Sequence, residues 1–309
     1  MKRLLAVLLL SLVLVACGCN NKDSHTQKSA SSQAVGDLQY QYDAKTETLT
    51  IQKFGTTINY EQTAKYDELC RIERPVKVVI AKGVTAIPKY FFRYATDNAT
   101  GNGQNHFNQI KSVVIPDTVT KIGDNAFNCC YGLESVSIPD SVKKIGTSAF
   151  ADCNHLKSVK LGKGLRTVSF SAFKRCEQLS NIVFSDSVTK ISDEAFSYCT
   201  ALKSVKLPAS VKAVGEKAFS NCYALAAVAL PAQLKTIGSF AFYDCPPLKS
   251  VTIPQSVKTI RPYAFGYIAE TSDDEETVKE VLNNGFVIKG VRGSAAEKYA
   301  QENSVTFVS

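Results

Sequence analysis

The sequence predicts an α/β repeat solenoid, in which coils of 23 residues stack into one column around a continuous core. An Ala-Phe pair recurs at this interval, and a cysteine follows the phenylalanine three residues later in six successive copies. This regularity overrides the two ordinary domains that 309 residues would otherwise suggest. The repeated phenylalanines are Phe127, Phe150, Phe173, Phe196, Phe219, Phe242 and Phe265.

Each copy is expected to form three sides of a coil. It opens with Leu-x-x-Val-x-Ile or a close variant, a pattern typical of a strand, and a proline often ends that strand. A Val-x-x-Ile-Gly segment follows, where glycine would ease a turn. We expect Ala-Phe-x-x-Cys to form one helical turn, and the strands to be parallel because every coil runs the same way. The regular copies start at Ile110, Leu133, Leu156, Leu179, Leu202, Leu225 and Leu248.

The solenoid is predicted over residues 75–270, with caps at both ends. Residues 36–74 contain two alternating apolar segments around the turn Asp43–Thr48, which predicts an N-terminal β-hairpin cap. The first copy departs from the consensus and carries an insertion near residues 96–107, which we expect to be a surface loop.

Residues 271–309 are predicted to form a C-terminal helix-strand cap. Residues 271–284 are acidic at first and then helix-like, and 286–288 are apolar. A helix is expected from Ser294 to Asn303, with Ser294 as its N-cap and Glu297 completing a capping box. A final strand is expected at residues 305–308.

Residues 1–16 read as a signal peptide, with Lys2 and Arg3 before an apolar run too short to span a bilayer comfortably. The run ends in Leu-Val-Ala-Cys at Cys17, which resembles the lipobox of bacterial lipoproteins and implies cleavage before Cys17 and its lipidation. The alternative is a plain signal peptide with a chance cysteine. Residues 17–35 are polar and predict a flexible tether between the membrane anchor and the folded part.

The repeat pattern Leu-x-x-Val-x-Ile-Pro-x-x-Val-x-x-Ile-Gly-x-x-Ala-Phe-x-x-Cys resembles the BspA-like class of bacterial leucine-rich repeat. The resemblance extends over residues 76–309, and its tail Gly-Ser-x-Ala-Glu-Lys-Tyr-Ala is similar to the ending of many such proteins. It implies a surface or secreted protein that adheres to host proteins or to other microbes. The departures are local: Gly162 and Ser185 replace proline, and Ser169 and Ser192 replace glycine.

The cysteines of the repeat are expected to form a ladder of buried thiols, because each occupies the same place in its coil. Neighbouring coils also bring cysteines close to the range that disulfides accept, and export permits oxidation, so some pairing stays open. Cys129 and Cys70 lie outside the ladder and are the stronger candidates for another role.

Catalysis has little support in the sequence. The three histidines are scattered, and neither a metal-binding histidine pair, a phosphate loop nor a nucleophile elbow is present. We expect no enzyme activity, no cofactor and no nucleic-acid partner. The formal charge falls by two from +8 to +6 once Lys2 and Arg3 are removed, which permits an anionic partner without requiring one.

The strand that opens each coil would turn lysines toward solvent, since side chains alternate on a strand. The predicted binding face comprises Lys157, Lys160, Lys203 and Lys206, for a protein or glycan partner. Alternatively, these lysines only solvate the sheet and discourage edge aggregation. The function expected is non-catalytic binding or adhesion at the cell surface, and the alternative is a structural or assembly component of the cell envelope. The sequence leaves the oligomeric state open.

Overall fold

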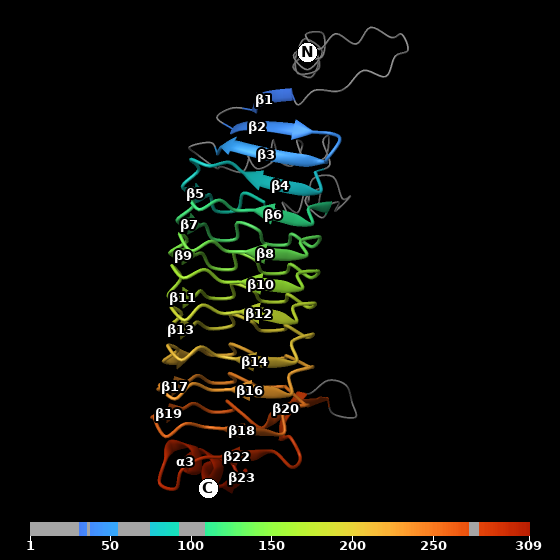
Figure 1. Cartoon of the computed structure of the whole chain (residues 1–309). Coiled ribbons are helices and arrows are strands. Elements are labelled where there is room, and N and C mark those ends of the chain that lie inside the picture. The colour runs from blue at the N-terminus through green and yellow to red at the C-terminus, as the bar shows by residue number, and fades with distance from the viewer. Residues whose placement is uncertain (1–30, 36–37, 55–74, 93–108, 272–277) are drawn as a thin grey trace, which may run out of the picture.

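The computed structural model describes residues 31–35, 38–54, 75–92, 109–271 and 278–309. The chain forms a column of stacked coils, with the N-terminal strands at one end and the C-terminal helix at the other (Figure 1). The predicted solenoid is therefore confirmed. The predicted signal peptide, Cys17, most of the tether, Cys70 and the insertion near residues 96–107 lie outside the described residues.

The first side of each regular coil is a three-residue strand, and these strands are parallel, as predicted; most of them pair with the strand of the next coil. The register equals one repeat, so that Val136 pairs with Val159 and Val159 with Ile182. Alternation on the strand buries the central residue and directs its neighbours outward, which defines the strand face. These strands are β6 (Ser112–Val114), β8 (Ser135–Ser137), β10 (Ser158–Lys160), β12 (Asn181–Val183), β14 (Ser204–Lys206), β16 (Ala227–Ala229) and β18 (Ser250–Thr252).

The second side carries two-residue strands that also pair in parallel from coil to coil and lie beside the strand face in Figure 1. Their second residue is buried in nearly every coil, as Ile145 and Ile191 are. These strands are β5 (Ala86–Ile87), β7 (Lys121–Ile122), β9 (Lys144–Ile145), β11 (Thr167–Val168), β13 (Lys190–Ile191), β15 (Ala213–Val214), β17 (Thr236–Ile237) and β19 (Thr259–Ile260).

The third side consists of consecutive turns, so the predicted helical turn at Ala-Phe-x-x-Cys is wrong. Two residues of each coil have a left-handed backbone, such as Ser148 (φ 51°) and Asp152 (φ 60°). Between them, the amide of each phenylalanine donates to the carbonyl of the alanine one coil further on, as Phe150 does to Ala172 at 2.9 Å. Amides that bond between coils alternate on this turn side with amides that close three-residue turns within a coil, as Ala151 does to Ser148 at 3.2 Å. An α-helical turn would instead form successive bonds four residues apart within one coil.

The repeat glycines serve close packing and not the turn that the sequence suggested. A Cβ atom at Gly123 would collide with the backbone of Lys89, and one at Gly146 with that of Asp124. The absence of a side chain therefore lets adjacent coils approach at this corner. In the coil where Ser169 replaces glycine, the serine hydroxyl donates to the Ile145 carbonyl at 2.5 Å. One coil earlier, the equivalent carbonyl, that of Ile122, accepts from the backbone amide of Gly146.

The core is a set of ladders in which identical side chains stack. The phenylalanine rings from Phe92 to Phe265 are nearly parallel, with centroids 4.8 to 5.4 Å apart. The repeat cysteines are buried beside them, and each thiol donates to the phenylalanine carbonyl of the preceding coil, as Cys176 does to Phe150 at 3.2 Å. All of these residues are nearly inaccessible to solvent, as the sequence predicted.

Strand pairing is interrupted at different levels on the two sheets. On the strand face it stops between β12 and β14 and between β16 and β18, and on the second side between β9 and β11. Phe184 lies at the first interruption, where the neighbouring coils have Leu161 and Leu207, and its ring packs edge-on against Phe196 at 5.8 Å. Because the interruptions are staggered, a paired sheet spans each of these levels.

The N-terminal cap contains the predicted hairpin. Strands β2 (Leu38–Asp43) and β3 (Thr48–Lys53) are antiparallel, and β3 pairs in parallel with β4 (Lys77–Ile80), the first strand of the solenoid. A further strand, β1 (Ser31–Val35), pairs antiparallel with β2. It lies within residues 17–35, so the predicted tether boundary is wrong by at least the length of this strand.

The C-terminal cap has more strand than predicted. Strands β20 (Tyr267–Thr271) and β21 (Val278–Leu282) form an antiparallel hairpin, so the helix-like interpretation of residues 271–284 is wrong for β21. Strand β22 (Val287–Lys289) continues the strand face by pairing with β18, and β23 (Thr306–Val308) pairs with β22.

The single described helix, α3 (Ala295–Glu302), begins at the predicted N-cap. Ser294 Oγ accepts from the amide of Ala296, and the Glu297 carboxylate accepts from the amide of Gly293 at 2.6 Å. The capping box is therefore displaced by one residue from the predicted pattern, because the glutamate bonds the residue before the N-cap. Both bonds satisfy amides that have no partner inside the helix.

Candidate binding surfaces

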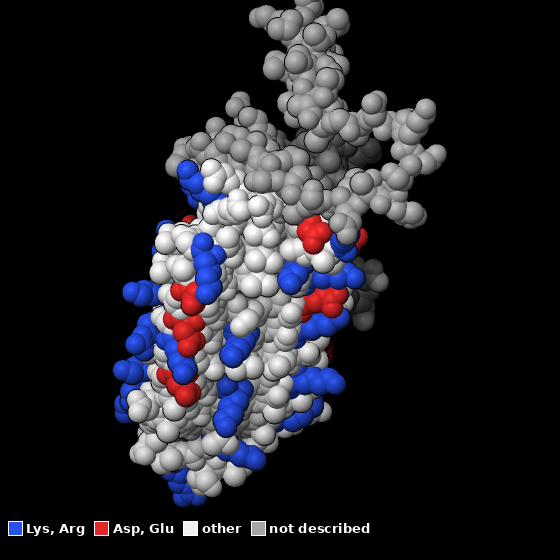
Figure 2. Space-filling model, turned by 45° about the horizontal axis from the view of Figure 1, so that its top comes forward, with Lys and Arg blue, Asp and Glu red and all other residues white. Residues whose placement is uncertain are grey.

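All four predicted lysines are exposed: Lys160 and Lys206 end strands β10 and β14 of the strand face, and Lys157 and Lys203 immediately precede these strands. Lys157 and Lys160 belong to the coil of β10, and Lys203 and Lys206 to the coil of β14. Two coil steps separate the pairs, about 10 Å at the usual strand spacing. Figure 2 shows basic side chains distributed along one face of the column, with acidic side chains among them. The structure therefore brings the predicted residues onto one surface.

The positive charge of this surface is partly neutralised. Lys157 Nζ lies 3.3 Å from the Glu134 carboxylate, and both side chains are exposed, so the pair is screened and weak. Lys249, further along the same face, donates to the Asn283 side chain at 2.6 Å. Within the described residues, Lys160, Lys203 and Lys206 have no ion pair.

The coil between the two lysine pairs is uncharged on the strand face. It presents Asn181 and Val183, and the valine is 47% exposed. Beyond Lys206, β16 presents Ala227 and Ala229. Most side chains on the strand face are thus short, and lysines project from it at the coils of β10 and β14. A surface with this relief suits an extended partner.

The turn side carries a recess of about 470 Å³ that the sequence did not indicate. We call it the turn-side recess and define it by Ser197, Tyr198, Ser220, Asn221, Phe240 and Tyr243. Its volume is within the range of small-molecule sites, about 300–1,000 Å³. Lys174 and Glu194 bound one end, and Glu280 of the β20–β21 hairpin lies at the other.

The recess exists because one position of the repeat changes in size from coil to coil. The residue after the buried phenylalanine is long in two coils, Lys174 and Tyr243, and small in the two coils between them, Ser197 and Ser220. Adjacent coils align this position, so two serines in succession leave a hollow flanked by long side chains. The signal is visible in the sequence only once the register of the turn side is known.

The floor of the recess is polar and its rim is aromatic. Ser197 Oγ and Ser220 Oγ, both buried, are 2.9 Å apart, and the Ser220 hydroxyl also donates to the Lys217 carbonyl. Asn221 Nδ2 donates to Asp244 Oδ2 at 3.0 Å. On the rim, the Phe240 ring meets Tyr243 edge-on at 5.3 Å.

Two ion contacts and a hairpin hold the rim in place. Lys174 and Glu194 form a half-buried salt bridge at 2.5 Å, and the Lys217 ammonium lies 5.6 Å from the centre of the Phe240 ring. The Asp244 carboxylate accepts from the Ala269 amide of β20 at 3.2 Å. Partial burial, with the Glu280 carboxylate nearby, raises the pKa of Tyr243 above its ordinary value.

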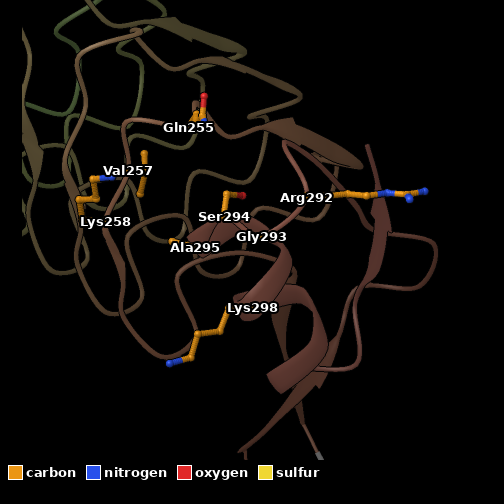
Figure 3. Close-up of a pocket in the computed structure, with 8 residues that line it drawn as sticks. All are labelled: Gln255, Val257, Lys258, Arg292, Gly293, Ser294, Ala295 and Lys298. Carbon is orange, nitrogen blue, oxygen red and sulfur yellow. The ribbon is translucent and has the colours of Figure 1, made fainter.

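A second hollow of about 350 Å³ lies between the last coil and the start of α3. Three cations border it, yet Figure 3 shows Lys258, Arg292 and Lys298 pointing away from one another. The arrangement does not converge on a point that an anion could occupy. Ser294 and Glu297 already bond the amides at this end of the helix.

The thiol ladder shows no reactive character. Burial raises the pKa of Cys222 to about 12 and raises that of Cys153 and Cys199 well above the ordinary range. A protonated, inaccessible thiol is a poor nucleophile and a poor metal ligand. Cys130, Cys153, Cys176, Cys199, Cys222 and Cys245 are all free.

The described residues contain no cluster of three or more histidine, cysteine or acidic side chains that could hold a metal ion. Nor is any helix within this part of the chain both long and apolar enough to cross a bilayer.

Comparison with known proteins identifies the repeat. A family model described as BspA type leucine rich repeat region matches residues 76–203 and 189–275 in six copies. The search of curated proteins gives no significant match.

Solved structures with similar chains are bacterial leucine-rich repeat proteins. A leucine rich cell surface protein from Faecalibacterium prausnitzii is 26% identical (87% of this chain and 67% of that chain, TM-score 0.48). The T. pallidum leucine rich repeat protein is also 26% identical (73% and 83%, TM-score 0.45). A leucine-rich repeat protein from Bacteroides ovatus is 22% identical (89% and 76%, TM-score 0.45).

Proposed function

The chain belongs to the family of BspA-type leucine-rich repeat proteins, and from this premise we propose that it is a non-catalytic binding protein of the bacterial cell surface. The family is not known for enzymes. The partner is a protein or glycan, recognised through the strand face of the middle coils. The observation that supports this face is the exposure of Lys160, Lys203 and Lys206 without an ion pair among the described residues.

The attachment that we propose is a lipid on Cys17, which lies outside the described residues. The support is the order of features in residues 1–17: two basic residues, an apolar run, a small residue and then cysteine. The tether after Cys17 would hold the solenoid away from the membrane, which suits a protein that presents an extended face to a partner.

Charge on the strand face is tested by a variant in which Lys157, Lys160, Lys203 and Lys206 are changed to glutamine. The probe is heparin, a soluble polyanion, with affinity measured across a salt series. We expect the wild type to bind more tightly at low salt and to lose affinity as salt rises, because the Debye length at physiological salt is only about 8 Å. The variant should bind at least tenfold more weakly at low salt.

A matched control changes four exposed lysines of the second side, Lys121, Lys144, Lys190 and Lys212, to glutamine. This control alters the net charge equally and leaves the strand face intact. Equal affinity of the wild type and the strand-face variant at low salt would reject the charged face. Equal loss in both variants would show that only total charge matters.

Lipid anchoring is tested separately by Cys17→Ser, because the anchor and the repeat fold are distant in sequence. We expect the variant to leave the detergent phase in phase-separation experiments, while its circular dichroism spectrum matches that of the mature wild type. Continued partition of the serine variant into the detergent phase would reject lipidation at this residue.

The alternative function is a structural or assembly component of the cell envelope, with contacts among copies of this chain. Digestion of intact cells with an added protease separates the two. A displayed binding protein is cut, whereas a component enclosed in the envelope is protected until the cells are opened.

A further inference from the structure

We propose that the turn-side recess is a second binding site, and that it holds a short neutral oligosaccharide. The site lies on a different side of the column from the strand face and is independent of the lysines discussed above. Three properties of the recess point to this ligand: aromatic ring faces on its rim, hydroxyl groups on its floor, and charges that cancel.

The rim offers surfaces for the apolar side of a sugar ring. A pyranose presents a face of C–H groups, and such a face packs well on an aromatic ring, whose face carries partial negative charge. Tyr198, Phe240 and Tyr243 line the recess. Two of these rings already carry neighbours over their faces. Phe240 has Tyr263 stacked at 4.9 Å and the Lys217 ammonium at 5.6 Å. Tyr198 has the Arg175 guanidinium at 5.4 Å from its centre. The stacking contact therefore falls to Tyr243 and to the other face of Tyr198.

The floor offers partners for sugar hydroxyl groups. The Ser220 proton goes to the Lys217 carbonyl and the Ser197 proton to Ser220 Oγ, so each oxygen keeps lone pairs with which to accept from a sugar hydroxyl. Asn221 adds an amide held in place by Asp244. Small-molecule sites combine apolar walls with a few placed polar groups in this way.

The charges around the recess favour a neutral ligand. Lys174 and Lys217 are balanced by Glu194 and Glu280, and the first lysine is already engaged by Glu194. An anion would meet no excess positive charge, and a cation no excess negative charge. Ser197 and Ser220 are one coil step apart, but the recess runs three steps, from Lys174 to Tyr243. Three steps are about 14 Å at the usual strand spacing, which suits a ligand of two linked rings better than a single one.

The chain itself supplies the variant that closes the recess. Ser220→Tyr places at this position the residue that the next coil carries as Tyr243, so the turn geometry is known to accept it. A second variant, Ser197→Lys, copies Lys174 of the preceding coil. Phe170→Ala is the matched control, because Phe170 is a 45% exposed aromatic residue of the turn side that does not line the recess.

The probes are neutral di- and trisaccharides built from glucose, galactose, mannose or N-acetylhexosamines, tested by saturation-transfer NMR on the whole mature protein. We expect at least one probe to bind the wild type and Phe170→Ala alike. Its affinity should fall at least tenfold in Ser220→Tyr and in Ser197→Lys. The strand-face lysine variant should retain sugar binding, which keeps this test separate from that of the proposed function.

Each contrary result overturns the proposal. If no neutral saccharide in the panel binds the wild type, or if binding survives in both recess-filling variants, the recess is not a sugar site. Binding of uncharged peptides alone, lost in the same variants, would assign the recess to a protein partner. Circular dichroism and thermal melting establish that each variant is folded before binding is compared.

Discussion

At the scale of single residues, the repeat places one side chain in the same chemical setting many times over. Each repeat cysteine is buried and donates its thiol proton to the phenylalanine carbonyl of the coil before it, at 3.2 to 3.4 Å. The thiol therefore fills space and also satisfies a carbonyl. Removing the proton would leave a charge in the core without a partner, which is why burial raises the pKa of these groups.

Alkaline pH should therefore destabilise the fold through the thiol ladder. An unfolded cysteine titrates near about 8.5, whereas Cys222 in the fold titrates at about 12. Between these values the folded chain keeps a proton that the unfolded chain has lost, so the free energy of unfolding falls as pH rises. The loss is about 1.4 kcal/mol per pH unit for each such thiol, and the full contribution is present below the unfolded pKa.

The measurement is urea denaturation of the wild type and Cys222→Ala at several pH values above the unfolded thiol pKa. We expect the alanine variant to be less stable at neutral pH but to lose stability less steeply with pH, because one titrating group is gone. Tyrosines and lysines titrate in both proteins, so the difference in slope isolates the thiol. Parallel slopes would contradict the buried, protonated state of Cys222.

At the scale of elements, the C-terminal cap substitutes for a missing coil. In the coils, the phenylalanine amide donates to an alanine carbonyl of the next coil, as Phe242 does to Ala264. Phe265 has no next coil, and the Tyr299 hydroxyl of α3 takes that place. It accepts from the Phe265 amide at 3.0 Å and donates to the Phe265 carbonyl at 2.9 Å. One hydroxyl thus satisfies both the amide and the carbonyl of Phe265.

Tyr299→Phe should destabilise the protein by about 1–3 kcal/mol, because it leaves a buried amide and carbonyl unpaired with little change in volume. Chemical denaturation gives the magnitude, and hydrogen exchange at the Phe265 amide should accelerate. Tyr263→Phe is the matched control, since Tyr263 is half-buried in the same last coil and has no hydrogen bond from its hydroxyl among the described residues. A Phe265 amide that exchanges as slowly in Tyr299→Phe as in the wild type would contradict the capping role.

The sequence predicted those elements whose pattern is set by a single coil. Strand residues such as Val136 and Val159, the core phenylalanines and the N-cap Ser294 follow from local periodicity and capping chemistry. The turn side was wrongly predicted because every second amide there bonds to the next coil. In addition, its left-handed residues include Lys217 and Phe240, where glycine or asparagine would be the usual signal.

The two candidate surfaces also differ in whether the sequence could predict them. Alternation along a strand was enough to place Lys160 and Lys206 on the strand face. The turn-side recess depends on the alignment of Ser197 with Ser220 and on the approach of Glu280 from a hairpin far along the chain. Neither relation exists within one repeat, so the pattern of the sequence could not reveal the recess.

At the scale of the whole molecule, stability is distributed along a line of neighbouring coils. Phe196 contacts Phe173 and Phe219 with ring centroids 5.4 and 5.3 Å away, and Phe184 packs on its edge. It lies at the level where pairing on the strand face stops between β12 and β14. The core at this level therefore supports a junction that already lacks part of its backbone bonding.

Phe196→Ala should lower the free energy of unfolding by about 3–5 kcal/mol through lost burial and a cavity. Because coils interact with nearest neighbours, the weakened junction should also let the two halves unfold in separate transitions. Calorimetry and urea denaturation followed by tyrosine emission, which is usable because the chain has no tryptophan, report both effects. Phe170→Ala is the exposed control, and a melting curve of Phe196→Ala identical to that of the wild type would contradict the role of this residue.

The unbroken series of amide bonds on the turn side, from Phe92 to Phe265 and on to Tyr299, also has a mechanical meaning. These bonds lie along the axis of the column, so a pull on its two ends loads them one after another. A coil that gives way releases 23 residues, about 80 Å of extended chain, while the coils behind it stay folded. A surface protein built in this way would absorb tension in steps and lengthen before it lost its hold.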